Sequence, residues 1–176
     1  MTDITLVTGG CRSGKSDNAL ALAEDISESG RVFVATCIPH DTEMKDRVAR
    51  HRRERSATWD TVEAPLDLAA AVAEHSRPGR VLLVDCLTLW VSNLMGASED
   101  PEILRGHVDD LVKALEQSRC PVVVVSNEVG CGIVPENRLA RLFRDVAGSV
   151  NQRVAAVVDT VIWMVAGIPV KVKPAH

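Results

Sequence analysis

The stretch Gly9-Gly10-Cys11-Arg12-Ser13-Gly14-Lys15-Ser16 stands between an apolar run, residues 4–8, and a segment with helical spacing, residues 17–29. It fits the pattern G-x-x-x-x-G-K-[ST], in which glycines let the backbone turn its N–H groups toward phosphate oxygens. In such a loop Lys15 reaches the β- and γ-phosphates and the Ser16 hydroxyl can ligate Mg²⁺, while the following helix adds its N-terminal dipole. The stretch therefore predicts a phosphate-binding loop for a nucleoside triphosphate, with each of its residues as a nucleotide contact.

Short runs rich in Val, Ile and Leu recur on both sides of this loop, and segments with helical spacing separate them. The runs are continuous rather than alternating, as in strands buried on both faces of a parallel sheet. The expected strands are residues 4–8, 32–36, 81–85, 122–126, 161–165 and 170–172, and the expected helices are residues 17–29, 41–55, 66–75, 101–118 and 136–158. This alternation predicts an α/β domain with a mostly parallel sheet and right-handed crossovers. Because no long polar linker or repeat divides the chain, residues 1–176 are expected to form a single P-loop nucleotide-binding domain.

The composition limits the classes of partner. Hydrophobic residues make up 46% of the chain and charged residues 25%, which is typical of a globular protein. The formal net charge of −4 argues against a protein that coats nucleic acid. No apolar run reaches the roughly 18 residues of a membrane span, and the start, Met1-Thr2-Asp3, lacks the basic region of a signal peptide. We expect neither a nucleic-acid partner nor a membrane span.

The cysteines indicate a compartment rather than a site. The chain has five of them, an odd number, and none forms a C-x-x-C pair. Neither a disulfide framework nor a zinc site is therefore predicted, and a reducing cytoplasm is the expected location.

Asp85 is the expected acidic partner of the phosphate loop. It closes the apolar run 81–85, and phosphate-loop enzymes hold their metal with a carboxylate at the end of such a strand. We expect Ser16 and Asp85 to hold Mg²⁺. An alternative is that Asp85 caps a helix beginning at Leu87, and the two roles can coexist.

Three classes of protein use such a site: small-molecule kinases, GTP-dependent switches and nucleotidyl-transferring enzymes. A switch needs an N-K-x-D reader of the base, and the nearest approach in this chain is Asn127-Glu128. The stretch 145–148 fits D-x-x-G, but it lies within a helical pattern rather than after a strand. The switch class is therefore disfavoured.

A basic segment gives a local charge opposite to that of the whole chain. Residues 45–55 hold six basic and two acidic residues, a sum of 6 − 2 = +4, and His51 lies among them. Such a segment is either a solvated helix face or a surface for phosphates, and the need for a polyanion pocket favours the second. His51 is either a packed histidine or a nucleophile that attacks a nucleotide α-phosphate, with the arginines neutralising the transition state and the departing pyrophosphate.

Three blocks together resemble one family. They are residues 7–16, the segment 41–63 that contains His51 and Trp59, and above all the block from Ser126-Asn127-Glu128-Val129-Gly130 to Asn137-Arg138, which continues to residue 171. Over essentially the whole chain the sequence resembles the bifunctional adenosylcobinamide kinase and adenosylcobinamide-phosphate guanylyltransferase family of cobalamin biosynthesis. Cys11 stands where the family usually has alanine, a small-for-small change from which no loss of activity is inferred.

The resemblance implies two reactions on one chain. ATP or GTP phosphorylates the hydroxyl of the aminopropanol arm of adenosylcobinamide, and GMP is then transferred from GTP onto that phosphate through a guanylyl-histidine. The family's histidine falls on His51. The resemblance further implies a RecA-like three-layer fold, a homotrimer, and these additional nucleotide contacts: Thr36, Cys37, Arg52, Arg53, Glu54, Arg55, Glu63 and Asp85.

Two features of the most specific block stay open from the residues alone. Asn127 and Glu128, at the carboxyl end of an expected strand, either orient the acceptor or the metal or form a structural turn before a helix starting near Pro135. The row Arg138, Arg141 and Arg144 either meets phosphates or pairs with acidic neighbours.

Two rivals to the bifunctional enzyme remain. One is a monofunctional small-molecule kinase in which His51 is structural, and the other is a non-catalytic nucleotide-binding regulator. A covalent adduct formed with GTP would separate the first rival from the transferase.

Overall fold

The computed structural model describes residues 2–39, 42, 46, 49, 58–98 and 100–174. The elements are β1 Ile4–Gly9, α1 Lys15–Ile26, β2 Arg31–Ala35, β3 Trp59–Glu63, α3 Leu68–His75, β4 Val81–Asp85, α4 Leu87–Ala97, α5 Pro101–Glu116, β5 Val122–Val125, α6 Arg138–Val157, β6 Thr160–Val165 and β7 Ile168–Lys173. The strands form a seven-stranded sheet in the order β3-β2-β4-β5-β1-β6-β7. Neighbouring strands are parallel except for the β6–β7 pair, which is antiparallel.

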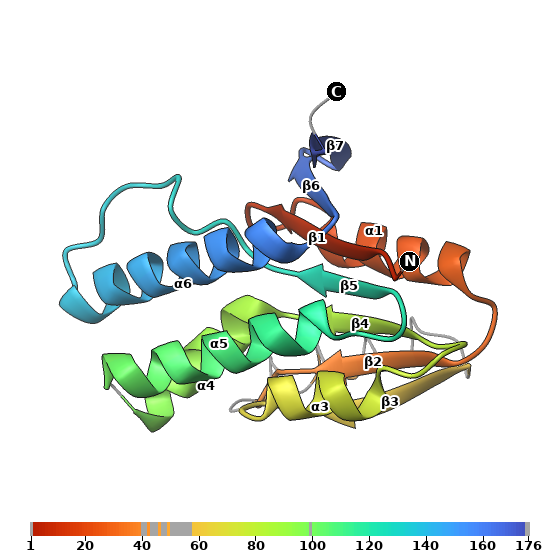
Figure 1. Cartoon of the computed structure of the whole chain (residues 1–176). Helices are drawn as coiled ribbons and strands as arrows, with labels where there is room; N and C mark the ends of the chain where they lie inside the picture. Colours follow the sequence, from red (N-terminus) through yellow and green to blue (C-terminus); the bar gives the residue numbers. More distant parts are fainter. Residues whose placement is uncertain are drawn as a thin grey trace.

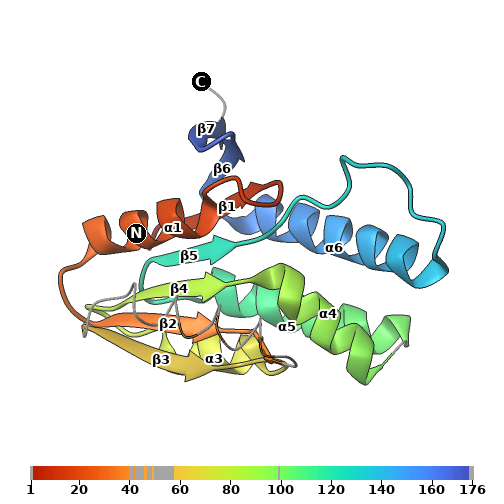
Figure 2. The same ribbon diagram turned by 180° about the vertical axis from the view of Figure 1, so that it is seen from behind.

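Helices cover both faces of the sheet, so the molecule has three layers. The buried side chains of α3, α4, α5 and α6 pack on one face together with alternate residues of β1, β2, β4 and β5. On the other face α1 packs with Val7, Phe33, Leu83 and Met164. Figure 1 shows α3, α5 and α6 in front of the sheet, and Figure 2 shows α1 on the reverse side. Because the central strands are buried from both sides, they need continuous apolar runs, and all four residues of β5 are valines.

The edge strand β3 is missing from the sequence-based expectation, and α4 is present there only as the helix beginning at Leu87 in the alternative role of Asp85. The edge strand β3 reads Trp-Asp-Thr-Val-Glu, and none of its residues is fully buried, so it carries no apolar run. Helix α4 reads Leu-Thr-Leu-Trp-Val-Ser-Asn-Leu-Met-Gly-Ala and is apolar on nearly all sides, so no helical periodicity marks it. Within the described ranges, no helix combines the length and the apolarity needed to cross a bilayer.

Side chains fix the start of two helices. Asp100 accepts a hydrogen bond from the Glu102 amide at 2.9 Å, so the expected start of α5 at Pro101 is confirmed. Asn137 accepts from the Ala140 amide at 3.1 Å, so α6 begins at Arg138 rather than at the expected residue 136. Of the expected helix 41–55, residues 42, 46 and 49 are helical and the others lie outside the described residues.

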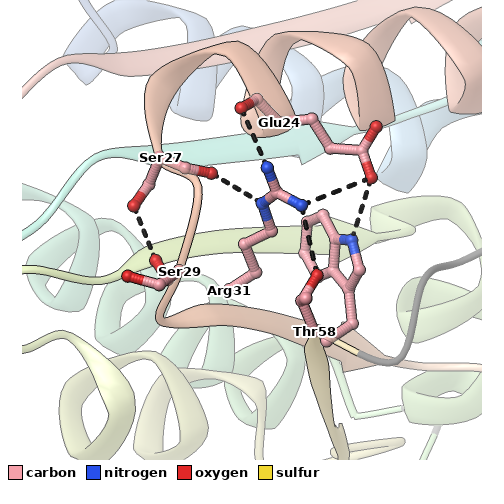
Figure 3. Close-up of polar contacts among 6 residues, drawn as sticks. Glu24, Ser27, Ser29, Arg31 and Thr58 are labelled. Atoms are coloured by element: carbon pink, nitrogen blue, oxygen red, sulfur yellow. Dashed lines mark hydrogen bonds and ion pairs between the residues drawn. The ribbon is translucent and has the colours of Figure 1, made fainter.

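An arginine clamp ties α1 to the amino ends of β2 and β3. The Arg31 guanidinium donates to the carbonyl oxygens of Ser27 at 2.6 Å and Glu24 at 3.1 Å, and to Thr58 Oγ1 at 3.2 Å (Figure 3). It lies 6.0 Å from the centre of the Trp59 ring, whose indole N–H donates to Glu24 Oε1 at 3.2 Å. The clamp lies at the amino edge of the sheet, opposite the phosphate loop.

We expect Arg31→Ala to lower the free energy of unfolding by about 2 kcal/mol, because several donors to oxygen and a cation–π contact are lost together. Arg31→Lys should not restore it, since one ammonium cannot reproduce the planar set of donors. Urea unfolding followed by tryptophan fluorescence measures both variants.

Arg105→Ala serves as the control, because Arg105 pairs with Glu102 at 3.4 Å on the exposed surface of α5. It should change stability by less than about 0.5 kcal/mol. An Arg31→Ala protein as stable as this control would contradict the clamp.

Candidate functional site

The phosphate loop lies where the sequence predicts it, between the carboxyl end of β1 and the start of α1 at Lys15. Within it, Gly14 has φ +84° and Arg12 has φ +54°, both in the left-handed region. Left-handed residues within a tight loop turn successive backbone N–H groups toward one side, which creates an anion-binding concavity. Cys11 and Arg12 are exposed, whereas Ser13 and Lys15 are buried. The loop thus has the form of a phosphate cradle.

Gly9 is required by close packing as well as by its backbone conformation. A Cβ atom there would lie 2.6 Å from the Met164 carbonyl oxygen of β6 and 2.9 Å from Ser13 Oγ, and φ is +150°. Gly14 also meets the β6–β7 turn, since its Cβ would lie 3.6 Å from Gly167 Cα. The neighbouring hairpin therefore helps to shape the loop.

The Lys15 side chain folds across the loop. Its residue is only 7% exposed, and its ammonium donates to the Gly10 carbonyl oxygen at 2.5 Å and to Ser13 Oγ at 3.4 Å. A buried ammonium needs such partners, because an unpaired charge away from water is costly. The positive charge is thus held inside the cradle, where a phosphate would lie.

Two buried polar atoms flank the phosphate loop without a hydrogen-bond partner. Among the buried side-chain atoms of the described residues, they are Thr8 Oγ1, directly before the loop, and Asn18 Oδ1, in the first turn of α1. Buried polar atoms are nearly always paired, so a polar ligand at this end of the sheet is a natural occupant.

The expected acidic residues lie along the same edge of the sheet. Glu63, Ala35 and Asp85 are register partners at the carboxyl ends of β3, β2 and β4, and Asp85 pairs onward with Val125 of β5, the neighbour of β1. Open α/β sheets bind ligands at this edge. The N-cap position of α4 is Cys86 rather than Asp85, so the helix-capping alternative for Asp85 is wrong.

The donors at this edge fit Mg²⁺ better than a transition metal. No group of three or more His, Cys, Asp or Glu side chains that could hold a metal occurs among residues 2–39, 58–98 and 100–174 or at 42, 46 and 49. What the site offers is the Ser16 hydroxyl at the start of α1 and the half-buried Asp85 carboxylate. Mg²⁺ typically takes one or two protein oxygens together with phosphate oxygens and water, so the residues fit this ion.

Thr36 stabilises the carboxyl edge of the sheet by bonding to the backbone of Cys86. Its residue is fully buried, and its hydroxyl both accepts from the Cys86 amide and donates to the Cys86 carbonyl, each at 2.8 Å. Asn93 donates to the Thr36 carbonyl at 2.8 Å and to the Pro65 carbonyl at 3.0 Å. Donation from the Thr36 hydroxyl to a nucleotide would replace its bond to the Cys86 carbonyl, whereas its bond from the Cys86 amide could persist. Cys37, the next residue, is half-buried at the same edge.

The Cys86 thiol is not a nucleophile at neutral pH. Burial, reinforced by the negative charge of Asp85, raises its pKa to about 12. The thiolate is the reactive form, so a thiol with this pKa stays protonated and inert.

The block that carries the resemblance forms a loop held by arginines. The Glu128 amide donates to the Gly9 carbonyl at 2.9 Å, and Glu128 Oε1 accepts from the Gly130 amide at 2.7 Å. Arg144 donates to the carbonyls of residues 130 and 133 at 2.6 and 2.9 Å, and Arg141 to those of residues 135 and 136. Arg141 and Arg144 thus donate to backbone carbonyls of the loop that precedes their own helix, a third role that neither expected alternative included. Figure 1 shows this loop arching away from the sheet before α6.

The expected histidine and its neighbours cannot be placed at this site. His51, Arg52, Arg53, Glu54 and Arg55 lie outside the described residues. The structure therefore brings together the phosphate loop, Thr36, Cys37, Glu63 and Asp85 at one edge, and their contacts with a nucleotide stay predictions.

Comparison with known proteins identifies relatives over nearly the whole chain. The family model described as cobinamide kinase / cobinamide phosphate guanyltransferase matches residues 5–172. The bifunctional adenosylcobalamin biosynthesis protein CobU of Salmonella typhimurium is 44% identical over 180 residues, covering 96% of this chain and 98% of that protein. The corresponding CobP of Pseudomonas aeruginosa is 43% identical, with 96% of each chain covered, and CobU of Escherichia coli is 42% identical, with 96% and 98% covered. The resemblance drawn from the sequence blocks is confirmed.

Solved structures support the fold alone. A KaiC-like protein of Pyrococcus horikoshii has a TM-score of 0.53 at 13% identity, covering 92% of this chain and 70% of its own. The P4 protein of bacteriophage phi6, solved in complex with ADP, has a TM-score of 0.51 at 15% identity, covering 96% of this chain and 52% of its own. The RecA-like fold expected from the sequence is confirmed.

We expect Gly9→Ala to destabilise the nucleotide-free protein and to abolish its thermal stabilisation by GTP, because the added methyl group would overlap the Met164 carbonyl. Gly10→Ala is the matched control, since nothing lies within 4 Å of a Cβ at that position and its φ is not positive. Differential scanning fluorimetry without and with GTP measures both. Equal melting temperatures for the two variants would contradict the packing argument.

Proposed function

Since this chain belongs to the cobinamide kinase / cobinamide phosphate guanyltransferase family, we propose that it phosphorylates adenosylcobinamide with ATP or GTP. It then transfers GMP from GTP to that product, which gives adenosyl-GDP-cobinamide in cobalamin biosynthesis. The observation that carries the proposal is the phosphate loop, whose buried Lys15 ammonium lies across the cradle. Both reactions need this feature, because each moves phosphorus from a bound triphosphate.

In the kinase step the acceptor hydroxyl oxygen bonds to the γ-phosphorus and loses its proton to solvent, while the bond to the β,γ-bridging oxygen breaks, leaving ADP or GDP. The backbone amides of residues 9–16 orient the triphosphate, and Lys15 offsets the charge that collects on the departing diphosphate. Glu63, Cys37 and Asp85 line the same edge as further contacts, together with Thr36, which also holds the Cys86 backbone.

In the transfer step a ring nitrogen of His51 attacks the α-phosphorus of GTP, and pyrophosphate leaves. An oxygen of adenosylcobinamide phosphate then attacks the same phosphorus, which releases the histidine and forms the new diphosphate bond. Arg52, Arg53, Glu54 and Arg55 follow His51 in the sequence, and the arginines neutralise the pyrophosphate as it departs. One displacement becomes two, so the transferase shows ping-pong kinetics.

Ser16 and Asp85 are the residues that would hold Mg²⁺, which when bound neutralises charge on the phosphate oxygens. This fit rests on the Ser16 hydroxyl oxygen and the Asp85 carboxylate oxygens, which are the type of ligand that Mg²⁺ prefers. We also place the enzyme in the cytoplasm, where its five free cysteines stay reduced.

We further propose that the chain works as a homo-oligomer, a trimer by family resemblance. The support is an exposed apolar face on the β6–β7 hairpin, which projects from the molecule in both ribbon views (Figures 1 and 2). Trp163 pairs with Val170, and Val165 with Ile168, and these side chains are between 41% and 65% exposed. A second copy of the chain would bury this face.

Intact-protein mass spectrometry after incubation with GTP and Mg²⁺ tests the transferase. We expect the native protein to gain one GMP in an acid-labile bond, because phosphoramidates hydrolyse in acid, and we expect His51→Ala to gain none. His107→Ala is the matched control, since His107 lies on α5 and outside residues 45–55, and this variant should be labelled like the native chain.

The absence of an adduct on folded protein that binds GTP would contradict the guanylyl-histidine and favour a monofunctional kinase. Binding of GTP without turnover of any corrinoid would instead favour a nucleotide-binding regulator.

Size-exclusion chromatography with light scattering tests the oligomer. We expect a mass about three times the 19.0 kDa of one chain, and Val170→Glu should yield monomers because a buried charge would oppose association. Ile103→Glu, at a half-exposed position of α5, should leave the assembly intact. A native monomer would contradict the proposal, and an intact Val170→Glu assembly would exclude the hairpin as the contact.

A further inference from the structure

Two helices hold the peptide that follows β5. Thr88 of α4 accepts a hydrogen bond from the Asn127 amide through Oγ1 at 2.7 Å. Asn151 of α6 donates from Nδ2 to the Asn127 carbonyl at 3.1 Å. The backbone N–H and C=O of Asn127 are therefore both bonded to side chains. If β5 were longer, these groups would bond to a neighbouring strand instead.

The side chains that hold this peptide also bond to one another. The Ser126 hydroxyl donates to Asn151 Oδ1 at 2.6 Å and lies 3.5 Å from Thr88 Oγ1. The Ser126 hydroxyl hydrogen is thus directed to Asn151, and the Asn151 amide in turn donates to the Asn127 carbonyl. Ser126 is 2% exposed and Thr88 is 8% exposed. A buried network whose groups are satisfied in this way is rigid and specifies one arrangement.

The held peptide connects the two halves of the nucleotide site. On one side, the Ser126 amide donates to the Val7 carbonyl at 3.0 Å and the Glu128 amide to the Gly9 carbonyl at 2.9 Å, at the start of the phosphate loop. On the other side, Thr88 follows Asp85 by three residues, in the first turn of α4. The network therefore spans from the acidic end of β4 to the phosphate loop at the end of β1.

We propose that Thr88 and Asn151 are positioning residues for phosphoryl and guanylyl transfer, which fix the separation between Asp85 and the phosphate loop through the Asn127 peptide. This inference rests on the proposed function. Neither side chain is assigned a contact with substrate. Their effect is on alignment, and a displacement of about 1 Å at a reacting centre can slow a reaction by about a hundredfold. Nucleotide affinity, which comes from the loop itself, should change little.

Steady-state kinetics with GTP and adenosylcobinamide tests the inference. We expect Thr88→Val, which keeps the shape and removes the hydroxyl, and Asn151→Ala to lower kcat by about tenfold or more. The dissociation constant of GTP, measured by calorimetry, should stay within about threefold, because both variants keep the loop that binds the phosphates. Thr88→Ser should keep native kcat, since it retains the hydroxyl.

Ser76→Ala is the matched control for the loss of a buried hydroxyl. Ser76 Oγ lies 2.9 Å from Ser118 Oγ and accepts from the Arg119 amide, between the end of α3 and β4 at the opposite edge of the sheet. This variant should lose thermal stability as the test variants do and should keep native kcat.

Amide hydrogen exchange supplies a readout that does not depend on turnover. Thr88→Val should speed exchange in peptides covering residues 126–130, where the Glu128 amide bonds to Gly9, and Ser76→Ala should not. Native kcat in both test variants, an equal loss of kcat in Ser76→Ala, or a parallel loss of GTP affinity would each overturn the inference. A native enzyme that binds GTP but does not turn over adenosylcobinamide would instead overturn the proposed function.

Discussion

The parallel direction of the central strands is the constraint on which the site depends. Because β2, β4, β5 and β1 run the same way, their carboxyl ends meet at one edge, and their last peptide groups lose strand partners there. In this protein side chains supply the missing partners: Thr36 bonds to the Cys86 peptide, and Thr88 and Asn151 bond to the Asn127 peptide. The carboxyl edge is thus shaped by the backbone groups that the end of the sheet leaves without strand partners.

At the two edges of the sheet, different kinds of side chain bond to the backbone groups that have no strand partner. At the amino edge a long cationic side chain, Arg31, donates to carbonyls at the end of α1 and to the Thr58 hydroxyl just before β3. At the carboxyl edge short neutral side chains do this work, and Thr36, Thr88 and Asn151 are the examples.

How far the sequence predicts the structure depends on what each element buries. The phosphate loop and the central strands are predictable, because β4 and β5 are buried on both faces and must be continuous apolar runs. The edge strand β3 is not, since exposure relaxes its pattern, and α4 is not, since burial on nearly all sides removes its periodicity. Within α4, Thr88 and Asn93 are polar residues in an apolar segment, the one signal that could have marked them as partners of the edge. The roles of Arg141 and Arg144 were beyond prediction, because backbone carbonyls of a loop have no sequence signature.

The bond between the Lys15 ammonium and the Gly10 carbonyl sets what an incoming ligand competes with. One of the three ammonium hydrogens is bonded to this neutral carbonyl, so an incoming group competes with it for the buried cation. A phosphate oxygen can do so, because a charge-assisted hydrogen bond is roughly twice as strong as one to a neutral acceptor. A nucleoside without phosphates brings only neutral acceptors and gains nothing over that carbonyl. The resting position of one lysine thereby discriminates between nucleotides and nucleosides before any contact with the base is made.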